Sequence, residues 1–309
     1  MARRKKGRPL DGVILVDKPD GWSSNAVLQK VRWLFQAQKA GHTGALDPLA
    51  TGLLPICLGE ATKFSRFLLD ADKAYRATAR LGVTTDTLDA EGEVTQTRPV
   101  PELNRDAVER LLAERFTGTI EQVPPMYSAL KRDGQKLYDL ARQGKTIERE
   151  ARPVQIFSLT LVELVGDEMV LDVHCSKGTY IRTLVGDIGE ALGCGAHITA
   201  LRRTRHGRFD LRDAQRLDTL IERQEAQGHE ALDEWLLPLS SLLVDLPQIE
   251  LSEAQARRFC HGNPVSHFTL SQPLTGLAQA VCDGRFLGVG ELSDDAGLQP
   301  IRLVVSPSD

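Results

Sequence analysis

Apolar runs and alternating patterns along this chain predict a series of β-strands. Residues 12–17 form a short apolar run, as expected for a buried strand. Residues 73–81 alternate strictly, so that Tyr75, Ala77, Ala79 and Leu81 share one face. Further strands are expected at residues 154–161, 169–174 and 196–203. The short connection between the first two of these predicts an antiparallel pair.

Other stretches place apolar side chains at helical spacing. The helices expected from this spacing cover residues 24–35, 60–69, 105–116 and 181–192. Ser23 or Ser24 can cap the first helix, Asn104 caps the third, and Gly193 ends the last. Helices combined with antiparallel strands predict an α+β domain with a mixed, mainly antiparallel sheet flanked by helices.

The chain is long enough for a large domain and a smaller one, because it has 309 residues. A change of character near residue 245 marks the expected boundary. Residues 10–245 carry the longer elements, whereas residues 246–309 contain short strands between turns. These short strands are expected at 277–282, 285–290 and 301–305. Residues 1–9 are rich in arginine and lysine and are expected to form a flexible basic arm.

Charge and cysteine content narrow the functional classes. The net charge is -4, so any contact with nucleic acid must come from local basic patches. Five scattered cysteines without a CxxC pair argue against a disulfide framework or a zinc ribbon, and favour buried thiols in a reducing compartment. No apolar run is long enough to cross a bilayer. We therefore expect a soluble cytoplasmic protein with no bound metal.

Residues 41–55 have a composition unlike the rest of the chain. Three glycines and two prolines argue against a regular helix or strand there, so we expect a shaped loop. Asp47 is the only acid of this stretch, and Pro48 holds Asp47 in an extended conformation. One interpretation is a carboxylate displayed to a ligand. The other is an ordinary turn that an aspartate caps.

The string Gly41-His42-Thr43-Gly44-Ala45-Leu46-Asp47-Pro48-Leu49-Ala50-Thr51-Gly52 resembles the catalytic motif of the TruB family of tRNA pseudouridine synthases. Other blocks resemble further motifs of that family, namely Asp17-Lys18-Pro19, Lys73-Ala74-Tyr75, Gly178-Thr179-Tyr180-Ile181-Arg182 and residues 196–203. The resemblance covers nearly the whole chain. It implies the pseudouridine synthase fold, followed by a small PUA-like β-barrel domain at residues 246–309.

The resemblance also implies roles for individual residues. Asp47 is expected to be catalytic, with Arg182 paired to it and Tyr75 placed against the target base. The other expected substrate-binding residues are His42, Tyr180, Leu201 and Lys18. An arginine in the first turn of a helix gains nothing from the helix dipole, which fits a specific partner for Arg182. Arg182 would keep Asp47 ionised, because burial alone would raise the pKa of that carboxyl.

Two of these assignments have alternatives. His42 can take up the space that an extruded base vacates, or it can be a buried structural histidine. Lys18 can contact a phosphate, or it can support the residues behind the site.

The implied reaction is the isomerisation of uridine 55 in the T-arm loop of tRNA to pseudouridine, which consumes no cofactor. A lone carboxylate suits this reaction, because a glycosidase needs a second acid. Asp47 can attack C1′ of the ribose or remove a proton from C2′, and the sequence leaves both routes open. We expect tRNA to be the partner of a monomeric enzyme that needs no second protein. The basic, turn-rich residues 124–152 are expected to grip the RNA.

Two other functions remain open from the sequence. A non-catalytic protein that binds or folds tRNA would predict a damaged Asp47 or Arg182, and both residues are present. A role in tRNA folding can, however, coexist with catalysis. A glycosidase or nucleotide hydrolase would require paired acids or a metal, and the chain lacks a P-loop.

Overall fold

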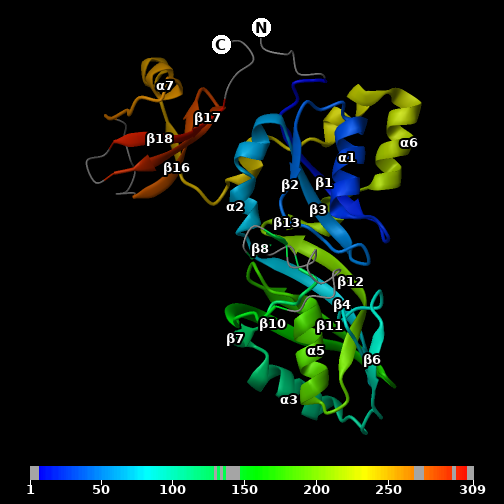
Figure 1. The fold of residues 1–309 in the computed structure, drawn as a ribbon. Coiled ribbons are helices and arrows are strands. Elements are labelled where there is room, and N and C mark those ends of the chain that lie inside the picture. Colours follow the sequence, from blue (N-terminus) through cyan, green and yellow to red (C-terminus); the bar gives the residue numbers. More distant parts are fainter. Residues whose placement is uncertain are drawn as a thin grey trace.

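The computed structural model describes residues 7–128, 131–132, 135–136, 147–267, 275–293 and 297–304 (Figure 1). In this part of the chain, ten strands form one sheet in the larger domain, with the main order β14-β1-β3-β12-β4-β11-β10-β7, while β2 pairs with β3 and β13 with β12. These strands are β1 (Gly12–Lys18), β2 (Ala40–His42), β3 (Thr51–Leu58), β4 (Lys73–Leu81), β7 (Gly118–Gln122), β10 (Arg152–Val165), β11 (Glu168–Cys175), β12 (Ala196–His206), β13 (Phe209–Asp210) and β14 (Gln215–Arg216). Among the described strands of this sheet, only the pairs β1·β14 and β12·β3 are parallel. The expected mixed, mainly antiparallel sheet is confirmed.

Helices cover this sheet and fill the connections. They are α1 (Ser24–Leu34), α2 (Ser65–Leu69), α3 (Arg105–Arg115), α5 (Ile181–Ala191) and α6 (Leu217–Gln227), with short 3-10 segments η1 (Gly59–Lys63), η2 (Leu211–Asp213), η3 (His229–Trp235) and η4 (Leu239–Leu242). The side chains of Ser23 and Asn104 cap α1 and α3, as expected. The single helix expected over residues 60–69 is instead two short elements, η1 and α2.

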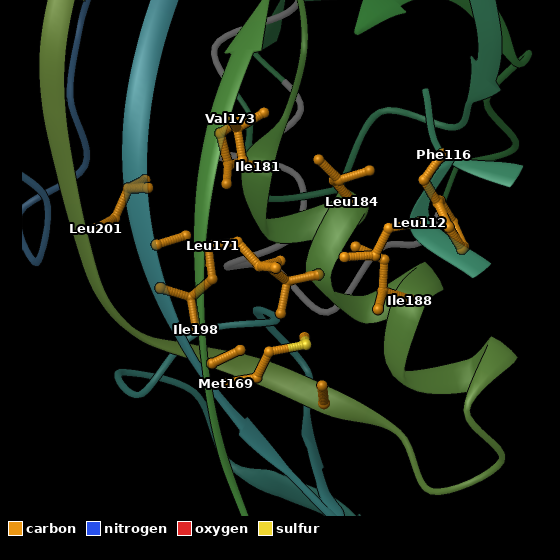
Figure 2. Close-up of a cluster of buried hydrophobic side chains, with 14 of the residues drawn as sticks. Leu112, Phe116, Met169, Leu171, Val173, Ile181, Leu184, Ile188, Ile198 and Leu201 are labelled. Carbon is orange, nitrogen blue, oxygen red and sulfur yellow. The ribbon is translucent and has the colours of Figure 1, made fainter. Parts of the chain in front are cut away.

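Helix α5 packs on the centre of the sheet. Leu184 and Ile188 of α5 lie over Leu171 of β11 and Ile198 of β12, and Leu112 of α3 closes the far side (Figure 2). All five side chains are at most 1% exposed. Removing such a buried side chain by a leucine-to-alanine change costs about 2–5 kcal/mol. This packing fixes the first turn of α5, which carries Arg182, relative to the sheet.

Helices α1 and α5 cover two parts of the same sheet face. Strand pairing sets Lys18 beside Gly52, Gly52 beside Arg203, and Arg203 beside Tyr75. Because paired residues share a face, these residues form one row, the crossing row, across β1, β3, β12 and β4. Lys18, at one end of the crossing row, is on the same face of β1 as Ile14, which packs on α1. Tyr75, at the other end, is on the face of β4 that packs on α5. The space between the two helices therefore lies over this row.

The loop expected over residues 41–55 is shorter than predicted. Strand β2 ends at His42 and β3 begins at Thr51, so residues 43–50 are the irregular part. Gly52 lies within β3 with a φ of +98°, and a Cβ there would stand 2.3 Å from the carbonyl oxygen of Arg203. Glycine at this position reflects a close approach of two strands, so the prediction of a loop there was wrong.

The arm expected at residues 1–9 is anchored at its end. The backbone N–H of Arg8 donates to the carbonyl of Gln36 at 2.6 Å, and the guanidinium of Arg8 pairs with the carboxylate of Asp233. Arg8 thus contacts the larger domain, while residues 1–6 lie outside the described part of the chain.

The second domain has its own sheet and core. It contains β15 (Gln248–Glu250), α7 (Glu253–Cys260), β16 (Gly276–Cys282), β17 (Arg285–Leu292) and β18 (Leu298–Leu303), with sheet order β15-β16-β17-β18. The first two expected strands are confirmed, and the third begins earlier than predicted. Among the described residues this sheet does not close, so the implied barrel is not seen there. Phe286 packs edge-on against Phe64 of the larger domain, with ring centroids 5.4 Å apart.

Two smaller features complete the described chain. Strands β5 (Val83–Thr85) and β6 (Val94–Thr97) form a ribbon beside α5, and β8 (Lys131–Arg132) pairs with β9 (Gln135–Lys136). The side chains of residues 129–146, which include most of the expected RNA grip, lie outside the described part. The five cysteines are all free thiols.

Candidate active site

Residues 43–50, the Asp47 loop, lie between α1 and α5 and are held from behind. The ammonium of Lys18 donates to the carbonyl of Pro48 at 2.9 Å, and the backbone N–H of Gly21 donates to the same oxygen at 3.1 Å. The hydroxyl of Ser24 donates to the carbonyl of Leu46 at 2.9 Å and accepts its N–H at 2.7 Å. These bonds satisfy the polar groups of a buried loop and fix its path beside Asp47.

Arg182 joins the Asp47 loop to the rest of the site. Its Nε lies 3.0 Å from Oδ2 of Asp47, and its Nη1 lies 3.2 Å from Oδ2 of Asp89. The guanidinium also donates to the carbonyls of Thr87 at 3.0 Å and Tyr127 at 2.7 Å. The side chain of Arg182 is only 7% exposed, so its single orientation is fixed by these acceptors.

The two carboxylates differ in their access to solvent. The side chain of Asp47 is 45% exposed, whereas that of Asp89 is 4% exposed. Asp47 can therefore meet a ligand, and Asp89 is enclosed behind Arg182. The expected pairing of Asp47 with Arg182 is present in the structure, and Asp89 is a further member of the group.

Several charges act on the carboxyl of Asp47. Burial raises the pKa of Asp47 above its ordinary value, the Arg182 guanidinium and the Lys18 ammonium oppose that rise, and Asp89 adds to it. Burial also lowers the pKa of Lys18 to about 8. The ionised form of Asp47 thus depends on both cations, as the sequence suggested for Arg182.

Asp89 is placed by a tight turn between β5 and β6. Its Oδ1 accepts from the hydroxyl of Thr87 at 2.5 Å and from the backbone N–H of Glu91 at 3.1 Å. Leu88 takes a φ of +61°, and its side chain would contact a Cβ placed on Gly186 of α5 at 3.2 Å. Sequence reasoning identified only a structured turn here and missed the role of Asp89. The sequence near Asp89 carries no signal of this role, because its partner Arg182 lies 93 residues further along the chain.

Tyr75, Tyr180 and Leu201, three of the other expected site residues, come from three different elements. Tyr75 is half-buried on β4, Leu201 is 8% exposed on β12, and Tyr180 immediately precedes α5. The Gln122 side chain accepts from the backbone N–H of Tyr180 at 2.8 Å and donates to its carbonyl at 3.0 Å. Burial raises the pKa of both phenols, and the charge of Asp47 adds to the rise in each. Tyr75 and Tyr180 thus share an electrostatic environment with Asp47.

His42 and Lys18 lie at the margin of this group. Nδ1 of His42 accepts from the backbone N–H of Gly44 at 3.4 Å, and burial lowers the pKa of its imidazole, with help from the charge of Arg203. His42 is thus a neutral, half-buried side chain at the start of the Asp47 loop. Lys18 is fully buried and bonded to backbone carbonyls, which fits support of the loop and not contact with a phosphate.

A cavity of about 750 Å³ lies on the opposite face of the sheet. Its guanidinium groups are largely neutralised by carboxylates that line the same cavity. The pairs are Arg76 with Asp172 at 2.7 Å, Arg202 with Asp17 at 2.7 Å and Arg212 with Asp210 at 2.9 Å. The crossing row and Asp47 lie on one face of the sheet and this cavity lies on the other, so we do not assign the cavity to the chemistry.

The side chains around Asp47 decide which kinds of catalysis the site can support. They contain no group of three or more histidine, cysteine or acidic side chains that could hold a metal ion. Asp89 is a second acid near Asp47, but its carboxylate is enclosed and bound to Arg182, so it cannot activate a water molecule. The site offers one accessible carboxylate, a fixed cation beside it, and two aromatic rings. No helix in the described part of the chain is long and apolar enough to span a membrane.

Comparison with known proteins agrees with this geometry. Residues 32–181 match the model of the TruB family pseudouridylate synthase N-terminal domain, and residues 182–244 match that of the tRNA pseudouridylate synthase B C-terminal domain. Residues 247–304 match a further C-terminal model, pseudouridine synthase II TruB.

Relatives over the whole chain carry the name tRNA pseudouridine synthase B. The protein of Ectopseudomonas mendocina is 55% identical over 96% of both chains, and that of Aliivibrio fischeri is 50% identical over 99% of this chain and 98% of the relative. Among solved structures, an H/ACA RNP bound to a substrate RNA superposes with a TM-score of 0.74 at 22% identity, over 100% of this chain and 92% of the other, and supports the fold. The chain belongs to the TruB family of pseudouridylate synthases.

Proposed function

We propose that this enzyme isomerises uridine 55 in the T-arm loop of tRNA to pseudouridine, with Asp47 as the catalytic residue. The pairing of an accessible Asp47 with a buried Arg182 carries the proposal. The names of the relatives support tRNA as the substrate. A tRNA substrate also supports a cytoplasmic location.

The reaction breaks the bond from C1′ to N1 of uracil and forms a bond from C1′ to C5. The proton on C5 leaves to solvent, and N1 gains a proton. Asp47 acts in its ionised form, either by attacking C1′ or by removing the proton from C2′. Arg182 and Lys18 favour that ionised form, because their charges lower the pKa of Asp47 against the effect of burial.

The uridine must leave its stack to reach Asp47. In our proposal Tyr75 and Tyr180 hold the extruded base, and Leu201 forms an apolar wall. His42 stands at the start of the loop, where a neutral imidazole can take up the space that the base leaves. Lys18 acts from behind the Asp47 loop. Residues 124–152 and the second domain extend the contact to the T-arm, and the enzyme works as a monomer.

The release of tritium from tRNA labelled at C5 of uridine tests this function. The wild-type enzyme should release tritium from position 55, and Asp47→Asn should release none while it still binds tRNA. Turnover by Asp47→Asn would refute the assignment, and activity on tRNA that lacks uridine 55 would refute the choice of target. The appearance of free uracil would indicate a glycosidase.

A substrate deuterated at C2′ separates the two routes. Removal of the C2′ proton predicts a slower reaction with the deuterated uridine, because that bond breaks. Attack at C1′ predicts nearly equal rates. Both outcomes leave the target nucleotide and the need for an ionised Asp47 unchanged.

A further inference from the structure

Arg203 is a buried cation that the proposed function does not use. It lies at the centre of the crossing row, between Gly52 of β3 and Tyr75 of β4. The residue is 1% exposed. Among the described residues, no carboxylate lies within ion-pair distance of its guanidinium. A buried charge without a counter-charge is costly, so a residue of this kind needs another explanation.

The hydrogen bonds of Arg203 join the two ends of the catalytic segment. Its Nε donates to the carbonyl of Leu53 at 2.7 Å, and its Nη2 donates to the carbonyl of Gly44 at 3.1 Å. Gly44 precedes Asp47, and Leu53 follows it on β3. One rigid, planar guanidinium therefore sets the separation between the entry to the Asp47 loop and the strand that leaves it.

The same guanidinium adjoins Tyr75. Arg203 and Tyr75 are directly opposite each other on β12 and β4, so their side chains share a face and lie within contact distance. The charge of Arg203 opposes the rise that burial causes in the pKa of Tyr75. Arg203 thus contacts both the segment that carries Asp47 and the residue proposed to hold the base.

The surroundings leave little freedom for this arrangement. The backbone of β3 approaches β12 so closely that only glycine fits at position 52, where a Cβ would lie 2.8 Å from the backbone nitrogen of Arg203. Gly44 has a φ of +144°, a conformation that favours glycine, and it lies beside the imidazole of His206 and the guanidinium of Arg203. His206 is fully buried, and burial with the charge of Arg203 lowers its pKa to about 2.

We propose that Arg203 is a positioning residue for the isomerisation, which sets the Asp47 loop relative to Tyr75 by binding Gly44 within that loop and Leu53 on the strand that follows it. It does not touch the RNA. The proposal rests on the assignment of Asp47 as the catalytic residue. Misplacing reacting groups by about 1 Å can cost on the order of 100-fold in rate, so loss of the guanidinium affects the chemical step.

Arg203→Lys is the test variant, because lysine keeps the charge but lacks the planar fork that reaches both carbonyls. Arg202→Lys is the matched control, since Arg202 is the next residue on β12, faces the other side of the sheet and pairs with Asp17. Titration with tRNA gives the concentration of folded, binding-competent enzyme, and the turnover of labelled tRNA is divided by that concentration. Thermal unfolding is recorded for each variant.

We expect kcat of Arg203→Lys to fall by about 10-fold to 100-fold, while KM for tRNA stays within about twofold. Arg202→Lys should keep both constants. A purely structural role predicts a lower unfolding temperature with normal kcat per folded site, and that result would overturn the proposal. A rise in KM without a fall in kcat would also overturn it, because it would place Arg203 in RNA binding.

A second variant covers the case in which Arg203→Lys does not fold. Arg203→Met removes the buried charge and keeps a long side chain, and it leaves no carboxylate without its partner, because Arg203 has none among the described residues. The same fall in kcat at unchanged KM is expected for it, and normal kcat contradicts the proposal. Asp47→Asn is assayed in parallel. If Asp47→Asn retains turnover, the proposed function fails; if it is inactive and both Arg203 variants are normal, only this inference fails.

Discussion

Asp89 gives the sharpest test of how the site is held. It accepts a charged hydrogen bond from Arg182 at 3.2 Å, and the two side chains are 4% and 7% exposed. Without Asp89, Arg182 keeps Asp47 as a carboxylate partner at 3.0 Å, and the loss of a buried hydrogen bond to a charged group costs about 1.5–3 kcal/mol. We therefore expect Asp89→Ala to lose about that much unfolding free energy. Asp89→Asn keeps an acceptor oxygen and should lose about 1–2 kcal/mol, the difference between a charged and a neutral hydrogen bond.

The matched control is an exposed pair of the same chemistry. Arg76 and Asp172 lie 2.7 Å apart, with side chains 54% and 43% exposed. Pairs in water contribute about 0–1 kcal/mol, so Asp172→Ala should change stability by no more than that. Urea unfolding at neutral pH measures both variants against the wild type. Equal losses for Asp89→Ala and Asp172→Ala would refute the argument from burial.

The same variants separate stability from catalysis. In Asp89→Asn the guanidinium of Arg182 keeps its contacts to Asp47 and to two carbonyls, but it loses one of the two carboxylates that fix its orientation. We expect kcat to fall by about 10-fold or more, because a small shift of Arg182 misplaces Asp47. Tritium release from labelled tRNA at a temperature where every variant is folded provides the measurement. Normal kcat in Asp89→Asn would show that Asp89 does not orient Arg182.

Three further outcomes follow from the charges around Asp47. The kcat of the wild type should fall as the pH drops through the raised pKa of Asp47. Arg182→Met should move this acid limb of the pH profile to higher pH, because the guanidinium lowers the pKa of Asp47. An acid limb of kcat at the same pH in the variant would contradict this. Lys18→Met should shift the limb in the same direction and lower kcat without raising KM for tRNA, whereas a rise in KM alone would identify a phosphate contact. Folding raises the pKa of Asp47, so the ionised carboxylate lowers the stability of the folded state at neutral pH. Asp47→Asn should therefore raise the melting temperature at pH 7. It should give no gain at a pH low enough to protonate Asp47 in both the folded and the unfolded state.

Much of the fold could be predicted because local patterns determine it. The alternation at residues 73–81 and the helical spacing at residues 181–192 each reflect one buried face, and the structure confirms β4 and α5. Capping by Ser23 depends on neighbours in sequence, so it was also predictable. The extent of the Asp47 loop was not. Its glycines and prolines suggested an irregular segment, but Gly52 serves a contact with β12, which is far away in sequence.

The residues that sequence reasoning missed are those whose partners lie in other elements. Asp89 was interpreted as part of a turn, because nothing near it in sequence indicates that it faces Arg182. Arg203 was one arginine of a strand that also contains Arg202 and Arg205. Its burial becomes evident only when the pairing of β12 with both β3 and β4 is known. Resemblance to a family finds residues that touch the substrate, and it finds their supports less readily.

The crossing row explains how these elements form one site. A strand sends alternate residues to opposite faces, so a slip of one residue in the pairing of β12 would exchange Arg203 with Arg202. The guanidinium of Arg203 would then leave the Asp47 loop, and Leu201 would leave the core under α5. The buried hydrogen bonds of Arg203 to Gly44 and Leu53 oppose such a slip, because it would leave both carbonyls without this donor. A polar group that costs free energy in the core can therefore fix both the register of the sheet and the position of the Asp47 carboxylate.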